Sequence, residues 1–167
     1  SLSPLSQLYG ERGDLDKELE YGLRVLEIRE SLGDKAGIAG ALNNLGVTYG
    51  RMGEVDKEEE YFVRALKINE ELDLKAEIAR MLENLGWVYG RQGDKKRQEE
   101  YLLRALEIRE DLGNPAGIAS SLSPLSQLYG ERGDLDKELE YGLRVLEIRE
   151  SLGDKAGIAG ALNNLGV

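Results

Sequence analysis

The sequence contains no cysteine and no histidine. Without cysteine the chain can form no disulfide and has no thiol chemistry. Without histidine it lacks the commonest protein ligand for transition metals and the side chain that most often acts as a general base. No phosphate-binding glycine loop and no distinct pair of facing carboxylates is present either, so we expect no metal site, no cofactor and no enzymatic activity.

Long apolar runs and an excess of positive charge are also missing. No apolar segment is long enough to span a bilayer. The opening residues, SLSPLSQLYG, lack the basic flank and apolar core of a secretory signal. The formal net charge of −10 repels phosphate backbones. We expect a cytoplasmic protein with no membrane partner and no nucleic-acid partner.

What the sequence does contain is a repeat with a period of forty residues. Residues 41–53 read ALNNLGVTYGRMG, residues 81–93 read MLENLGWVYGRQG, and residues 1–13 and 121–133 both read SLSPLSQLYGERG. A period of this size indicates stacked units that share a continuous core. We predict one solenoid over residues 1–167, with units at 1–40, 41–80, 81–120 and 121–160 and a partial unit at 161–167.

Each unit predicts two helices. In the second unit Asp34 can cap a helix that starts at Lys35, and Gly53 can end that helix in a left-handed conformation. The apolar residues between them recur at helical spacing, namely Ile38, Leu42, Leu45, Tyr49 and Met52. A second helix follows over about residues 55–72. No strand-like alternation is present, so the predicted fold class is all-α.

These residues resemble the tetratricopeptide repeat. The resemblance is carried by Leu42, Leu45-Gly46, Tyr49, Gly53, Phe62 and Ala65-Leu66. The forty-residue unit and the linker LGDKAGIA are similar to the longer-helix form found in kinesin light chain and the spindle-orientation adaptors. The resemblance implies a right-handed superhelical solenoid of antiparallel helix pairs, with a concave groove lined mainly by the first helix of each unit.

The sequence departs from the family pattern at two places. The Leu-Gly pair of the first helix is replaced by Leu5-Ser6 and Leu125-Ser126. Early in the second helix the family has a small alanine, where this chain has Glu18, Glu58, Gln98 and Glu138. These larger side chains leave open how the two helices of a unit pack together.

The predicted peptide-binding groove lies on the face of the first helices opposite the apolar stripe. Its residues are Asn43, Asn44, Val47 and Arg51 in the second unit, Arg80, Glu83, Asn84, Trp87 and Arg91 in the third, and Ser123, Gln127 and Glu131 in the fourth. This surface predicts a scaffold that binds an extended peptide or partner segment.

Two residue types in this surface have alternative interpretations. Asn44, Asn84 and Asn164 match the asparagine that precedes Leu-Gly in the subfamily, where the resemblance implies hydrogen bonds to a peptide backbone. The alternative is a hydrogen bond to a neighbouring helix. Trp87, the one tryptophan, can anchor an apolar side chain of a partner or can be buried between adjacent units.

Two further features favour structural roles. Pro124 interrupts a helical pattern, so it is expected to kink the helix, and the serines around it can satisfy part of the lost hydrogen bonding. The acidic segment Asp14–Glu20 has a faint likeness to a calcium loop but lacks the glycine and glutamate that such a loop needs. We interpret it as a helix start, where acidic residues favour the helix dipole.

Residues 121–167 are identical to residues 1–47, so the larger repeat is a triplet of 120 residues. A recent duplication, an engineered concatemer and a window cut from a longer array all fit this identity. It favours a competing hypothesis, a structural array that associates head to tail through uncapped ends. Leu2, Leu5 and Leu8 at one end and Ile158, Leu162 and Leu165 at the other are core-stripe residues that we expect to pack against another copy.

Overall fold

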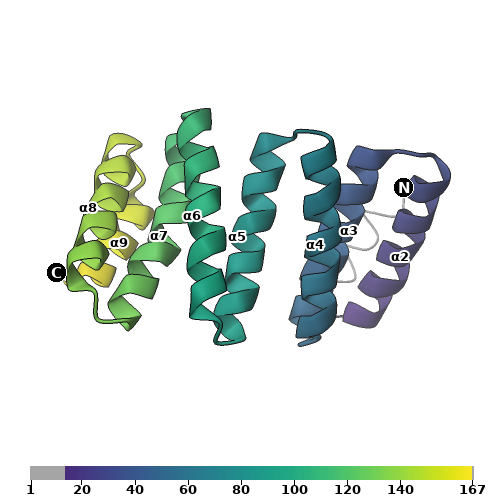
Figure 1. Ribbon diagram of the computed structural model, residues 1–167, viewed down its shortest axis with the longest axis horizontal. Coiled ribbons are helices and arrows are strands. Elements are labelled where there is room, and N and C mark those ends of the chain that lie inside the picture. The colour runs from purple at the N-terminus through teal and green to yellow at the C-terminus, as the bar shows by residue number, and fades with distance from the viewer. Residues whose placement is uncertain (1–13, 167) are drawn as a thin grey trace. The chain divides into compact units, whose positions relative to one another are not determined.

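The computed structural model describes residues 14–166, and this part of the chain contains eight α-helices and no strand (Figure 1). The helices are α2 (Leu15–Ser31), α3 (Lys35–Arg51), α4 (Val55–Glu71), α5 (Lys75–Arg91), α6 (Lys95–Leu112), α7 (Pro115–Glu131), α8 (Leu135–Ser151) and α9 (Lys155–Leu165). The predicted all-α class is confirmed. The expectations for Leu2, Leu5 and Leu8 and for the Leu5-Ser6 pair lie outside the described residues.

The helices begin and end where local chemistry satisfies their terminal groups. Asp34 accepts a hydrogen bond from the backbone nitrogen of Gly37 at 2.9 Å, which caps α3 as predicted. Asn114 caps α7 in the same way, with Pro115 at the first helical position. Gly53 follows α3 with a φ of +80°. Asp73, with a φ of 53°, is the one non-glycine residue with positive φ in the described chain.

The chain divides into two compact units, and the boundary between Val88 and Tyr89 falls inside α5. In the N-terminal unit α3 packs against both α2 and α4. Its core is formed by large apolar side chains that are almost completely buried, among them Leu42, Leu45, Tyr49 and Phe62. Burial of this apolar surface is the main term that holds the helices together.

In the C-terminal unit α7 packs against α6 and α8, and α8 packs against α9 (Figure 1). Leu102, Leu122, Leu125, Tyr129 and Val145 are buried together in its core. Pro124 is buried within α7, which runs as one helix from Pro115 to Glu131. The hydroxyl of Ser123 donates to the backbone oxygen of Ala119 at 2.9 Å, whereas the carbonyl that loses its helical donor to Pro124 is that of Ser120.

The large polar residues early in the second helices are accommodated by glycines in the first helices. A Cβ atom at Gly50 would collide with the carboxylate of Glu58, and one at Gly90 would lie 2.6 Å from the Nε2 of Gln98. Both polar side chains are buried. The family's small residue has therefore moved from the second helix to the first, which resolves how the two helices pack.

A similar exchange explains Leu125-Ser126. In the second unit Gly46 faces the ring of Phe62, and a Cβ atom at this glycine would lie 2.7 Å from the ring. In the fourth unit the small residue is on the other helix, because Ser126 faces Gly142. The Ser126 hydroxyl donates to the backbone oxygen of Glu138 at 2.8 Å and links α7 to α8.

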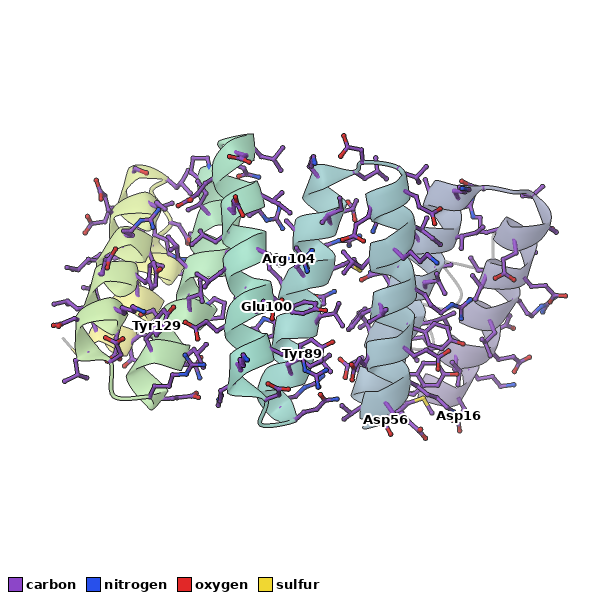
Figure 2. The ribbon with its side chains drawn as sticks, viewed as in Figure 1. Asp16, Asp56, Tyr89, Glu100, Arg104 and Tyr129 are labelled. Carbon is purple, nitrogen blue, oxygen red and sulfur yellow. The ribbon has the colours of Figure 1, made fainter. Side chains whose placement is uncertain are left out.

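The acidic segment opens α2 as a helix start. Asp14 caps the helix by accepting from the backbone nitrogen of Lys17 at 3.1 Å. Figure 2 shows Asp16 and Asp56 at the same end of α2 and α4, the end where acidic side chains favour the helix dipole. Within residues 14–166 no group of three or more acidic, histidine or cysteine side chains is arranged to hold a metal ion. Nor does any described helix have the length and apolar character that crossing a membrane requires.

Candidate functional site

The predicted groove residues lie on α3, α5 and α7, and all but one are at least partly exposed. The exposed members are Asn44, Val47, Arg51, Arg80, Trp87, Arg91, Gln127 and Glu131, while Glu83, Asn84 and Ser123 are half-buried. Asn43 differs, because only 7% of its surface is exposed. Because the chain divides into two compact units, the parts of this surface that belong to each unit are described in turn.

In the N-terminal unit the surface carries two exposed apolar side chains at equivalent positions of α3 and α5. Val47 is 43% exposed and Trp87 is 49% exposed, so Trp87 is not buried between helices. Val47 lies about one turn after Asn44 on α3, and Trp87 lies about one turn after Asn84 on α5. Residues one turn apart lie on the same side of a helix, so each apolar side chain shares a face with an asparagine. Exposed aromatic and aliphatic side chains on α5 and α3 are suited to an apolar group of a partner.

Three asparagines connect α3 and α5. The Nδ2 of Asn84 donates to the Oδ1 of Asn43 at 3.2 Å, and the Nδ2 of Asn43 donates to the Oδ1 of Asn44 at 3.3 Å. Asn84 thus hydrogen-bonds a neighbouring helix, which was one of the two alternatives for these residues. Asn44 remains exposed beyond this network, so its amide is accessible from the surface.

The arginines of this surface are tied to nearby acids. The Nη1 of Arg51 donates to the Oε2 of Glu18 on α2 at 2.8 Å, and the Thr48 hydroxyl donates to the Oε1 of the same carboxylate at 3.0 Å. Arg80 pairs with Glu77 one turn earlier on α5. Arg80 and Glu77 are both solvent-exposed, and an ion pair of this kind contributes about 0–1 kcal/mol, so it orients the guanidinium group more than it stabilises the fold.

In the C-terminal unit the predicted residues are engaged within the protein. Gln127 donates to the Oε1 of Glu131 at 3.1 Å, and Glu131 forms an ion pair with Lys95 of α6 at 2.5 Å. The bond from Lys95 lowers the pKa of the Glu131 carboxyl group. The described part of α7 exposes no large apolar side chain. The candidate site is therefore concentrated on α3 and α5.

Sequence reasoning missed a polar network that fastens α7 to α6. The hydroxyl of Tyr129, which is labelled in Figure 2, donates to the Oε1 of Glu99 at 2.7 Å. Arg132 pairs with Glu99 and donates to the backbone oxygen of Lys95. Burial raises the pKa of Tyr129, and its hydrogen bond to Glu99 raises this pKa further. For Glu99 the bonds from Tyr129 and Arg132 outweigh burial, so its pKa is lowered.

The signal for this network was present in the sequence. The equivalent positions on α2 and α3 hold Leu19 and Met52, an apolar pair in place of the ionic pair Glu99 and Arg132. The third equivalent pair keeps the acid as Glu59 but has Gln92 in place of the arginine, so among these three pairs only Glu99 and Arg132 combine an acid with an arginine. The network joins neighbouring helices and belongs to the scaffold.

Comparison with known proteins finds similarity to tetratricopeptide repeats. Residues 37–111 match the family model described as tetratricopeptide repeat. A crystal structure of BtubC (BKLC) from P. vanneervenii is 28% identical with a TM-score of 0.83, and the match covers 92% of this chain and 63% of that one. No curated protein sequence matches this chain.

Two further structures share the fold at lower identity. Nearly identical TPR-like repeats assigned to a kinesin light chain of Podosopora anserina are 16% identical with a TM-score of 0.77, covering 99% of this chain and 85% of that one. A Rap protein complexed with Competence and Sporulation Factor is 18% identical with a TM-score of 0.84, covering 96% of this chain and 45% of that one. The predicted resemblance to tetratricopeptide repeats, including the kinesin light chain form, is confirmed.

Proposed function

We propose that this chain, whose residues 37–111 match the tetratricopeptide-repeat family model, is a non-enzymatic scaffold for protein–protein interaction that binds an extended segment of a partner along α3 and α5. The observation that carries this proposal is the exposure of Trp87 and Val47 beside the asparagine network of the same unit. Isolated exposed apolar residues are common, but here they stand next to amide groups suited to a peptide backbone.

The apolar side chains and the asparagine amides of the site contribute to the binding free energy in different ways. Burying an aliphatic or aromatic side chain contributes about 1.5–3 kcal/mol, so an apolar group covering Trp87 and Val47 is the source of affinity. An extended segment carries unpaired backbone N–H and C=O groups, and an amide side chain can pair with either. Asn44 and Asn84 then supply the backbone hydrogen bonds that a desolvated segment needs.

A structural neighbour gives a precedent for binding by this fold, because the Rap protein structure holds Competence and Sporulation Factor. At 18% identity that likeness concerns the fold, so the chemistry of the partner is inferred from the residues of this chain alone. Those residues favour a segment with one large apolar side chain flanked by accessible backbone.

Intrinsic fluorescence tests the proposal directly in the wild type, because Trp87 is the sole tryptophan. Peptides selected from a random dodecapeptide library are expected to shift its emission on binding. The triple variant Asn44→Ala/Asn84→Ala/Trp87→Ala has no tryptophan, so its binding is measured by the fluorescence anisotropy of a dye-labelled peptide and should be at least about tenfold weaker. The matched control is Val63→Ala, which removes an exposed apolar side chain from α4 and should leave binding unchanged. Unaltered affinities in the triple variant would show that the groove is assigned wrongly.

A second candidate function is head-to-tail self-association. It is supported by α9, which repeats the sequence of α3 but buries less of it. Ala159 is exposed and Leu162 is half-buried, whereas their counterparts Ala39 and Leu42 are buried. Apolar surface of this kind gains free energy when a second copy covers it.

Sedimentation velocity over a range of protein concentrations separates the two candidates. Growth of the mean mass with concentration, without any added ligand, favours association. Ala159→Lys should suppress that growth because it places a charge on α9, while Leu143→Lys on the exposed face of α8 serves as the control. A constant monomer mass would rule out self-association and leave the binding scaffold.

A further inference from the structure

Asn43 is buried, whereas Asn44 beside it on α3 is exposed. It accepts a hydrogen bond from Asn84 on α5 and donates one to Asn44. We propose that Asn43 is a positioning residue that fixes the amides of Asn44 and Asn84 in opposite orientations, so that α3 offers a donor and α5 an acceptor to a bound backbone. This inference rests on the proposed binding function and adds the arrangement of groups that the site selects.

The hydrogen-bond inventory of the three amides gives this arrangement. A side-chain amide has one oxygen that accepts and one nitrogen that donates two hydrogens. Because the Oδ1 of Asn44 faces the Nδ2 of Asn43 at 3.3 Å, the Nδ2 of Asn44 is the group left for a ligand. Because the Nδ2 of Asn84 faces the Oδ1 of Asn43 at 3.2 Å, the Oδ1 of Asn84 is left to accept. The site therefore takes a ligand carbonyl over α3 and a ligand N–H over α5.

Because Asn43 is buried, the orientation of its amide determines the orientations of the Asn44 and Asn84 amides. Asn43 has little access to water, so reversing its amide would place oxygen against oxygen and nitrogen against nitrogen without solvent to compensate. Asn44 and Asn84 are more exposed, and on their own they would be free to turn. The orientation that a ligand meets is thus decided by Asn43, which need not touch the ligand.

Among the described first helices this arrangement occurs once. The equivalents of Asn43 are Glu83 on α5, Ser123 on α7 and Asn163 on α9. Ser123 bonds within its own helix, and Asn163 is exposed. Asn163 has the same sequence neighbours as Asn43, so it provides a matched control in which the same change should have no effect on binding.

The test substitutes Asn43→Asp and uses peptides selected from a random dodecapeptide library on the wild-type chain. A carboxylate only accepts hydrogen bonds, so Asn44 must turn its Nδ2 inward and present its Oδ1 to the ligand. In the wild-type background Asn44→Ala is expected to weaken binding about tenfold. In the Asn43→Asp background the same change should have no effect, and in the Asn163→Asp background it should again weaken binding about tenfold.

A second variant keeps the test valid if Asn43→Asp fails to fold, which circular dichroism would reveal. Asn84→Asp lies at a half-buried position and removes the donor to Asn43. Asn43 must then reverse its amide toward the new carboxylate, and this reversal turns Asn44. The effect of Asn44→Ala should disappear here also, although the two residues share no direct bond.

The outcomes separate the inference from the function on which it rests. If no selected peptide depends on Trp87, the proposed function fails. If peptides depend on Trp87 but Asn44→Ala weakens their binding equally in every background, the function stands and the positioning role of Asn43 is overturned. Loss of the Asn44→Ala effect in the Asn43→Asp or Asn84→Asp background, with its retention in the Asn163→Asp background, supports the role.

Discussion

Residues 14–47 and 134–167 have the same sequence, yet the two copies share only part of their structure. The local features agree closely. Asp34 and Asp154 each cap a helix by accepting from a glycine nitrogen at 2.9 Å, and each carboxylate also accepts from an arginine at 2.6 Å. Helix starts, turns and caps are therefore properties of the local sequence.

Equivalent residues of the two copies are buried to different extents. Leu15 is half-buried in α2, whereas Leu135 in α8 is 68% exposed. In the opposite direction Val25 is half-buried while Val145 is buried. Identical residues in identical helices thus acquire different environments from the helices around them. Which residues of a helix are buried is therefore determined by the helices that pack against it and not by its own sequence alone.

Matched truncations of the two copies should have the largest effect. Leu42 is fully buried, so Leu42→Ala is expected to lower the free energy of unfolding by about 2–5 kcal/mol. Leu162 is only half-buried, and Leu162→Ala should lower it by about 1 kcal/mol or less. Urea denaturation followed by circular dichroism measures both. Equal losses would contradict the conclusion that neighbours determine burial.

A smaller effect is expected at the turn between α4 and α5. Both copies use glycine at the equivalent position, Gly33 and Gly153, whereas this turn holds Asp73 at a φ of 53°. A left-handed conformation costs a non-glycine residue about 1–2 kcal/mol, and asparagine and aspartate tolerate it best. Asp73→Gly should therefore raise the free energy of unfolding by up to about 1 kcal/mol. The reverse change, Gly33→Asp, should lower it by a similar amount.

The smallest effect concerns pH, and it should be the same in both copies. The backbone bond from Gly37 is the main cause that lowers the pKa of the Asp34 carboxyl, and the bond from Gly157 does the same for Asp154. A lowered folded-state pKa stabilises above the ordinary value near 3.9, and this contribution is lost as pH falls through the folded value. Asn caps helices as well as Asp does.

Asp34→Asn and Asp154→Asn should therefore each remove a similar part of the acid sensitivity. The comparison uses urea midpoints measured from pH 7 down to about pH 3, with the wild type as reference. An acid sensitivity that persists in one variant and falls in the other would show that the two caps are not equivalent.

Local sequence was sufficient to predict the helices, the cap at Asp34 and the exposure of Val47, but it left open whether Trp87 is exposed or buried between adjacent units. The burial of Asn43 could not be predicted, because its partner Asn84 lies forty-one residues away. Its copy Asn163 confirms the difficulty, since it has the same neighbours in sequence and is exposed. The division of the array inside α5 was also beyond sequence reasoning, because the repeat pattern is continuous there.

The glycine–carboxylate fit between Gly50 and Glu58 has a consequence for how such arrays change over time. A crossover that joined the first helix of this chain to the second helix of a relative with alanine in place of Glu58 would leave a cavity next to Gly50. The reciprocal product, with a larger residue in place of Gly50, would bring that side chain into collision with the Glu58 carboxylate. Recombination within a hairpin is therefore penalised, while exchange at the turns between hairpins is tolerated. Whole hairpins, and groups of them, are the units that can be exchanged, and residues 121–167 repeat residues 1–47 at an interval of three such units.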